Sequence, residues 1–246
     1  QYARNAIFAG LMPLEIARNY PQYWKNDTDE GGKNLFEKEL LFEHLKRKRI
    51  DLKTQYLKIT NHQAGRKLAE NPDSILNHDF TALVYNFVDM LSHSKTEMEV
   101  IKELADDDRG YRSLTQTWFD NSPLLSLLKK VSEHGVQVFI TTDHGTINVK
   151  EPTKVVGDKN TNTNLRYKLG KNLSYENKDV YEAKQPERIK LPKVNVSSTY
   201  IFAKEDLFFA YPNNYNHYVK YYKNTYQHGG ISMEEMIIPV VRLNAK

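Results

Sequence analysis

Three short segments of this 246-residue sequence combine His with Asp or Gly in patterns that suit metal binding. Asp89 and His93 stand four residues apart after an apolar run, and Asp143 and His144 are adjacent after another. His228 precedes two glycines near the C-terminal end. Carboxylate oxygen and imidazole nitrogen are ligands of Zn²⁺, with Mn²⁺ or Mg²⁺ as alternatives. Because the chain has no Cys, a metal centre must use these two kinds of ligand.

Each of the three segments also has an ordinary structural interpretation. Asp-His-Gly is a common turn, an Asp-x-x-x-His pair is often a hydrogen bond on a helix surface, and His-Gly-Gly is often a flexible loop. Their occurrence together, each beside glycine or at the end of a predicted strand, favours a shared metal centre. The remaining histidines lack such partners and are interpreted as surface or core residues: His44, His62, His78, His134 and His217.

The elements that must position these residues alternate between helix and strand. Apolar runs at 81–88 and 136–140 predict strands, the first buried and parallel in character, and ligands of open α/β sheets bind beyond the carboxyl ends of such strands. Ser232 and Glu235 form a capping box, which predicts a short helix directly after His228. The fold class predicted is α/β, with a doubly wound sheet flanked by helices. Predicted helices cover 2–10, 14–19, 31–49, 63–70, 97–106, 114–134 and 216–223, and predicted strands cover 55–60, 81–88, 136–140, 200–203, 207–210 and 237–243.

The stretch 150–198 differs from the rest because it is rich in Asn, Lys and Tyr and lacks helical periodicity. We interpret it as a loop-rich basic insertion or cap over the active-site face. Arg166, Lys168 and Lys171 in it are candidates for contacting backbone phosphates of a short oligonucleotide, although each could equally lie on a solvated loop. Its first part holds two acidic residues, Glu151 and Asp158, against six basic ones: Lys150, Lys154, Lys159, Arg166, Lys168 and Lys171.

The amino-acid composition limits the kinds of protein that this chain can be. A hydrophobic content of 39% with 16 Tyr and 10 Phe supports one large globular domain. Without Cys there is no disulfide framework, thiolate zinc site, iron–sulfur cluster or Cys nucleophile. A net charge of +4 is too small for a general nucleic-acid binder.

No apolar run approaches the roughly 18 residues of a membrane span, so no membrane partner and a cytoplasmic location are predicted. Because Gln1 opens directly into a helical pattern, residues upstream are expected to be missing.

The ordered set of Asp and His residues resembles the alkaline phosphatase superfamily. The segment 228–240, His-Gly-Gly-Ile-Ser-Met-Glu-Glu-Met-Ile-Ile-Pro-Val, is similar to the terminal motif of that superfamily. A finer resemblance is to PglZ domains, closest to the PglZ effector domain of PorX-like response regulators, and it spans essentially the whole chain, 1–246. The stretches that carry it are Gln-Tyr-Ala-Arg-Asn-Ala-Ile-Phe-Ala-Gly-Leu at 1–11, Val-Tyr-Asn-Phe-Val-Asp-Met-Leu-Ser-His at 84–93 and Asn-Leu-Arg-Tyr-Lys at 164–168.

The resemblance implies two divalent metals, with Zn²⁺ as the first choice. Asp89, His93 and His228 would hold one ion, and Asp143 and His144 the other. Two ions about 4 Å apart would clamp a phosphate for in-line displacement. In the family the nucleophile is a Thr at the start of the first helix, which would fall immediately before Gln1. The domain would thus lack its N-terminal portion, with its nucleophile and one Asp ligand, and be catalytically incomplete.

The activity implied is that of a metal-dependent phosphodiesterase on nucleotide or oligonucleotide diesters. Arg4 and Asn5, one turn along the first helix, would neighbour the substrate phosphate, although Arg4 could also be a surface ion-pair partner. The family further implies a receiver domain upstream, a two-component response regulator and a homodimer. Two alternatives remain open: a phosphomonoesterase or phosphomutase on the same metals, and a regulatory module that binds a protein without catalysis.

Overall fold

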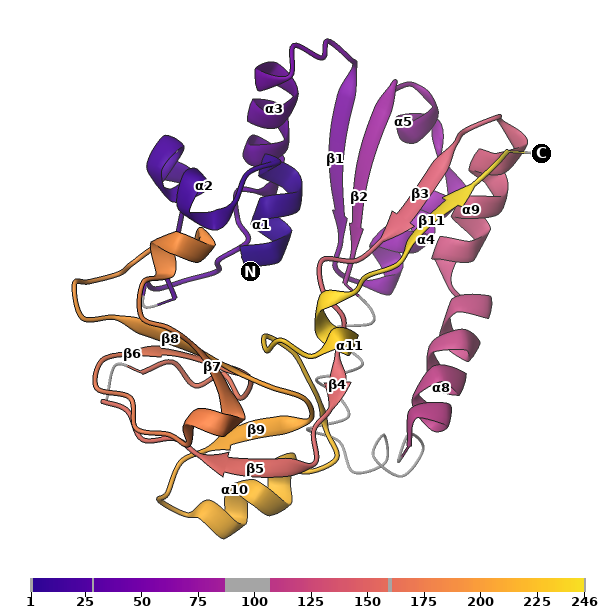
Figure 1. The fold of residues 1–246 in the computed structure, drawn as a ribbon. Coiled ribbons are helices and arrows are strands. Elements are labelled where there is room, and N and C mark those ends of the chain that lie inside the picture. The colour runs from indigo at the N-terminus through magenta and orange to yellow at the C-terminus, as the bar shows by residue number, and fades with distance from the viewer. Residues whose placement is uncertain (1, 28, 87–106, 159–160, 246) are drawn as a thin grey trace. The chain divides into compact units, whose positions relative to one another are not determined.

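The computed structural model describes residues 2–27, 29–86, 107–158 and 161–245. The chain forms two compact units, and each combines two segments that are far apart in the sequence. The first unit combines 1–50 with 143–238, and the second combines 51–142 with 239–246. Both units contain helices and strands, which confirms the α/β class predicted from sequence (Figure 1).

The helical part of the first unit is built on a small apolar core. Ala9, Ile16, Trp24 and Leu40 are all buried and pack together. The first helix ends at Gly10, whose φ of 57° lies in the left-handed region that glycine adopts most easily. The helices predicted over 2–10 and 14–19 are confirmed. The elements here are α1 (Tyr2–Ala9), α2 (Pro13–Asn19), the 3₁₀ turn η1 (Pro21–Tyr23) and α3 (Glu37–Arg47).

The remainder of the first unit consists of three small sheets. A three-stranded antiparallel sheet has the order β6-β8-β7, β5 pairs in parallel with β9, and β10 pairs antiparallel with β4. Helix α10 packs on β9, as Figure 1 also shows. Among the described residues of the stretch 150–198, β5, β6 and β7 are regular strand and the rest is mostly loop, and the role of the stretch as a cap stays a prediction. The elements are β4 (Ile147–Asn148), β5 (Glu151–Lys154), β6 (Tyr167–Gly170), η2 (Asn177–Asp179), β7 (Val180–Ala183), η3 (Pro186–Ile189), β8 (Thr199–Ala203), β9 (Leu207–Ala210), α10 (Tyr215–Tyr222), β10 (Tyr226–Gln227) and α11 (Met233–Met236).

The second unit holds two pairs of strands and four helices among its described residues. β1 and β2 pair in parallel over six residues each, whereas β3 and β11 pair antiparallel. The strands predicted at 55–60, 81–88 and 136–140 correspond to β1, β2 and β3. The predicted doubly wound sheet is not confirmed, since the described strands form separate pairs. The elements are β1 (Thr54–Ile59), α4 (His62–Glu70), α5 (Asp73–Leu76), β2 (Phe80–Tyr85), α8 (Asp108–Asp120), α9 (Pro123–Glu133), β3 (Val138–Thr141) and β11 (Val240–Leu243).

The helix predicted over 114–134 is two helices. Ser122 caps the start of α9, its hydroxyl accepting a hydrogen bond from the backbone N–H of Leu125, and Pro123 occupies the first position of that helix. These two residues therefore end the preceding helix and begin the next. The helix predicted over 97–106 lies outside the described residues.

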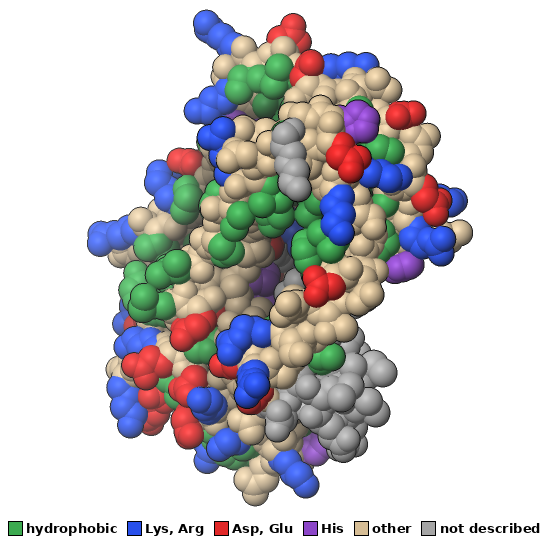
Figure 2. Space-filling model, turned by 90° about the vertical axis from the view of Figure 1, so that its right-hand side faces the viewer, with side chains coloured by type: hydrophobic (Ala, Val, Ile, Leu, Met, Phe, Trp, Pro, Cys, Tyr) green, Lys and Arg blue, Asp and Glu red, His purple; other side chains and the backbone are tan. Residues whose placement is uncertain are grey.

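Charge is mixed over the face of the protein that Figure 2 shows. On the face shown in Figure 2, Lys and Arg side chains are interspersed with Asp and Glu and do not merge into one continuous basic patch. This distribution agrees with the small net charge of +4. Among the helices of the described residues, none has both the length and the apolar character needed to cross a bilayer.

Candidate functional site

Three of the five predicted metal ligands lie together in the first unit. The antiparallel pairing of β4 with β10 places Ile147 opposite Gln227. His144 lies three residues before Ile147 and His228 directly follows Gln227, so this short ladder brings the two histidines side by side. Their rings stack with centroids 4.0 Å apart and planes 18° apart. Asp89 and His93 lie outside the described residues.

The Asp143 carboxylate lies between His144 and a cation from the first helix. Its Oδ2 accepts a hydrogen bond from Arg4 Nε at 3.3 Å and lies 3.8 Å from His144 Nε2. Burial alone would raise the pKa of the Asp143 carboxyl, but the charges of His144 and Arg4 outweigh it and hold that pKa below its ordinary value. Asp143 is therefore ionised at neutral pH, which is the form that binds a cation.

Arg4 also contacts Glu37, a residue that sequence reasoning missed. Arg4 Nη1 lies 3.4 Å from Glu37 Oε1, and Glu37 is 1% exposed at the start of α3. The neighbouring Asn5 is equally buried and donates a hydrogen bond to the Lys33 carbonyl oxygen at 3.3 Å. Arg4 thus joins two carboxylates at the edge of the site, and an isolated Glu at a helix start carries no sequence signal for such a role.

The family resemblance assigns Asp143 and His144 to one ion and His228 to the other. Among the described residues, no three His, Asp or Glu side chains converge as ligands of one ion. Asp143, His144 and His228 carry carboxylate and imidazole groups, the kinds of ligand that divalent metals bind, and their assignment to two ions stays a prediction.

Arg166 has a different environment from the one expected of a substrate contact. The residue is fully buried, and its guanidinium forms an ion pair with Glu235, with Nη2 2.6 Å from Oε2. Burial raises the pKa of Glu235, but the bonds from Arg166 outweigh it and leave that pKa below its ordinary value. With no exposed atom in this structure, Arg166 cannot meet a phosphate here. The capping box of Ser232 and Glu235 is confirmed.

Lys168 is also buried rather than presented to a substrate. It is 2% exposed, and its ammonium donates a hydrogen bond to the Asn162 carbonyl oxygen at 2.8 Å and lies 5.5 Å from the centre of the Tyr211 ring. The sequence pattern of alternating polar residues could not reveal this burial. Both Arg166 and Lys168 therefore act inside the first unit.

The buried ammonium of Lys168 predicts a pH dependence of stability. Burial lowers the pKa of Lys168 to about 8, below the value of about 10.4 in an unfolded chain. Between these values the unfolded chain binds more protons, so the free energy of unfolding should rise with pH, by up to about 1.4 kcal/mol per unit. We expect Lys168→Met to remove this rise in urea denaturation measured from about pH 8 to pH 10. Lys171→Met, at an exposed position, should retain it; an equal rise in both variants would contradict the assignment.

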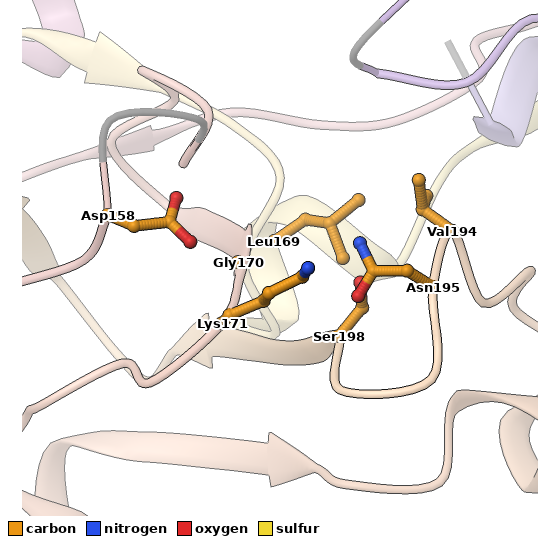
Figure 3. Close-up of a pocket in the computed structure, with 7 residues that line it drawn as sticks. All are labelled: Asp158, Leu169, Gly170, Lys171, Val194, Asn195 and Ser198. Carbon is orange, nitrogen blue, oxygen red and sulfur yellow. The ribbon is translucent and has the colours of Figure 1, made fainter.

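Lys171, the third predicted basic contact, is exposed and lines a cavity of about 370 Å³ within the first unit. Figure 3 shows its side chain and that of Asn195 pointing toward one another, with the Asp158 carboxylate on the other side of Lys171. The lining does not include Asp143, His144 or His228. The complete lining is Asp158, Leu169, Gly170, Lys171, Val194, Asn195 and Ser198.

Comparison with known families gives a match over nearly the whole chain. The family model described as the BREX system PglZ alkaline phosphatase-like domain matches residues 1–243. No match was found among curated proteins. Proteins of the alkaline phosphatase-like superfamily typically bind divalent metals.

Proposed function

Because this chain belongs to the PglZ family of alkaline phosphatase-like domains, we propose that it is a metal-dependent phosphodiesterase acting on nucleotide or oligonucleotide diesters. The family supports the coarser assignment, a phosphoric ester hydrolase. One observation carries the proposal. Asp143 lies beside His144, and the ring of His144 stacks on that of His228, 84 residues later in the sequence.

In the proposed site, Asp143 and His144 hold one divalent ion and His228 helps to hold a second, together with Asp89 and His93. Divalent ions there, Zn²⁺ first and Mn²⁺ or Mg²⁺ as alternatives, supply Lewis-acid stabilisation of charge on the phosphoryl oxygens. The ionised state of Asp143 supports its role as an anionic ligand. The stacked rings of His144 and His228 support the proposal that these two histidines would serve one shared metal centre.

The first turn of α1 lies beside the proposed metal ligands. Arg4 in that turn is hydrogen-bonded to Asp143, so the start of the helix lies against them. Backbone N–H groups and the positive end of the dipole favour phosphate at such a helix start.

Arg4 is the substrate contact that the structure supports best. Its guanidinium is held by Asp143 at 3.3 Å and Glu37 at 3.4 Å, which fixes its orientation beside the proposed metal ligands. Asn5 stays a proposed neighbour of the phosphate. Lys171 stays a proposed contact for a more distant phosphate of an oligonucleotide, since its side chain is exposed.

The test compares two chromogenic esters with the full-length protein. Bis-p-nitrophenyl phosphate, a diester, should be hydrolysed faster than p-nitrophenyl phosphate, and EDTA should abolish both activities until Zn²⁺, Mn²⁺ or Mg²⁺ is restored. A strong preference for the monoester would replace the proposal with a phosphomonoesterase. A protein that holds two metals by elemental analysis and hydrolyses neither ester would instead be a binding module.

We also propose that the domain is the effector of a two-component response regulator, with a receiver domain upstream and a homodimer as its active form. The support is the resemblance of the stretches 1–11, 84–93 and 164–168 to PorX-like proteins. Light scattering of the full-length protein with and without beryllofluoride, which mimics receiver phosphorylation, tests it. A mass unchanged by beryllofluoride would contradict phosphorylation-driven dimerisation.

A further inference from the structure

A buried ion pair joins Arg166 to Glu235, which lies seven residues after His228 in the sequence. Arg166 is 0% exposed and Glu235 is 4% exposed. Arg166 Nε donates to Glu235 Oε1 at 3.0 Å and Nη2 donates to Oε2 at 2.6 Å. The two groups therefore meet through two parallel hydrogen bonds, the geometry in which an Arg–carboxylate pair is strongest and most directional.

Both charges are hydrogen-bonded beyond their mutual contact. The Arg166 guanidinium also donates to the carbonyl oxygens of Ala203 and Glu205 at 3.3 and 2.7 Å, and to that of Leu207. Glu235 Oε1 accepts a bond from the Gly230 N–H at 2.8 Å, and Oε2 accepts one from the Ser232 N–H at 3.1 Å. A buried pair gains net stability only with such additional bonds.

The hydrogen bonds of Glu235 reach both histidine-bearing segments. The N–H of Gly145, the residue after His144, donates to the Glu235 carbonyl oxygen at 2.9 Å. The N–H of Gly230, two residues after His228, donates to the Glu235 carboxylate. One residue thus anchors the two segments through its backbone and its side chain.

The glycines allow both segments to approach this anchor closely. A Cβ on Gly145 would overlap the Glu234 carbonyl oxygen. A Cβ on Gly230 would lie 2.6 Å from Arg166 Nη2 and 2.7 Å from the Ala203 carbonyl oxygen. The contact is therefore too tight for any side chain at either position, and the spacing of the two segments is fixed by backbone as well as by charge.

We propose that Arg166 and Glu235 are positioning residues that hold the His144 and His228 segments in register before any metal binds. Neither side chain touches substrate; the pair acts through the Gly145 and Gly230 backbones. The expected effect on metal affinity rests on the proposed function. The expected effect on the hydrogen-bonded structure of the two segments does not.

The first experiment uses Glu235→Gln, with Glu234→Gln as the matched control one residue away on the exposed side of α11. In the full-length, metal-free wild type, amide hydrogen exchange should protect Gly145 and Gly230. Glu235→Gln should weaken the Gly230 protection, because its single amide oxygen replaces only one of the two carboxylate acceptors, while Glu234→Gln retains it. Zn²⁺ affinity, measured by chelator competition, should fall roughly 10- to 100-fold in Glu235→Gln alone. Unprotected Gly145 and Gly230 amides in the wild type would overturn the proposal.

The second variant separates positioning from stability. Arg166→Met with Glu235→Met removes both buried charges and so avoids an unpaired one, but it leaves without partners the backbone groups that the pair satisfies. Its Tm should therefore fall, and circular dichroism should show that it is still folded at the temperature of the assay. It still frees the Gly230 N–H, and its Zn²⁺ affinity and Co²⁺ absorption spectrum should change as in Glu235→Gln. Wild-type affinity and spectrum in the folded double variant would overturn the positioning role. If the wild type binds no Zn²⁺, the proposed function fails, and the exchange measurements alone decide whether the pair orders the two segments.

Discussion

Replacing Asp143 by Asn is expected to lower kcat/KM for phosphate ester hydrolysis by about 10³-fold, because a lost metal ligand removes several kcal/mol of transition-state stabilisation. Asn keeps the size of the side chain and can still accept the hydrogen bond from Arg4 Nε. It lacks the negative charge that the lowered pKa of Asp143 maintains at neutral pH. Steady-state kinetics with the preferred p-nitrophenyl ester measures the effect.

The matched control is Asp51→Asn, the same change at an exposed position in the second unit. It should leave kcat/KM unchanged. Elemental analysis should find one fewer divalent ion in Asp143→Asn than in the wild type, with both variants folded by circular dichroism. Full metal content and undiminished hydrolysis in Asp143→Asn would remove Asp143 from the proposed ligand set, and signalling that survives the substitution would favour a non-catalytic module.

Replacing Gly145 by Ala should destabilise the protein by about 3 kcal/mol, the upper part of the range for overpacking a tight contact. The new Cβ would overlap the Glu234 carbonyl oxygen and lie 3.0 Å from the Glu234 carbonyl carbon. These are backbone atoms of α11, so no side chain can move aside to make room. The hydrogen bond from the Gly145 N–H to Glu235 would break, and His144 would move with it.

Gly135→Ala provides the comparison for Gly145→Ala. Gly135 has a φ of 75° and open space where a Cβ would lie. Ala there should lower the free energy of unfolding only by the roughly 1–2 kcal/mol that the left-handed backbone conformation costs an L residue. Urea denaturation of both variants measures the difference, and Gly145→Ala should also lose hydrolysis while Gly135→Ala retains it. Equal losses of stability with full activity in both would show that the Gly145 contact relaxes at little cost.

Local signals in the sequence predicted the features that depend on local chemistry. Ser232 with Glu235 three residues later predicted the capping box, and the glycine after the first apolar stretch predicted the end of α1 at Gly10. Ser122 followed by Pro123 is an equally local signal for the start of a helix. The apolar periodicity over 114–134 continues past it, and a single helix was therefore predicted there. In these examples the capping residues indicate where a helix begins or ends better than the apolar periodicity does.

Features that depend on distant partners could not be predicted in the same way. β3 pairs antiparallel with β11, about a hundred residues later, and no local signal in the sequence indicates the partner or its direction. Arg166 and Glu235 are 69 residues apart, and a basic residue in a Lys-rich stretch resembles a surface cation until its partner is known. The neighbourhood of Asp143, His144 and His228 was predicted through family resemblance, and the β4–β10 ladder supplies its physical cause.

The β4–β10 ladder has only two residue pairs, Tyr226 with Asn148 and Gln227 with Ile147. Side chains along a strand alternate between faces, so a shift of one residue in so short a ladder reverses every side chain it carries. Surface loops generally tolerate changes in length. Here an inserted residue between His144 and Ile147, or a deletion beside His228, would separate the two rings without altering either histidine. The number of residues in these two connections is therefore as much a part of the site as the side chains themselves.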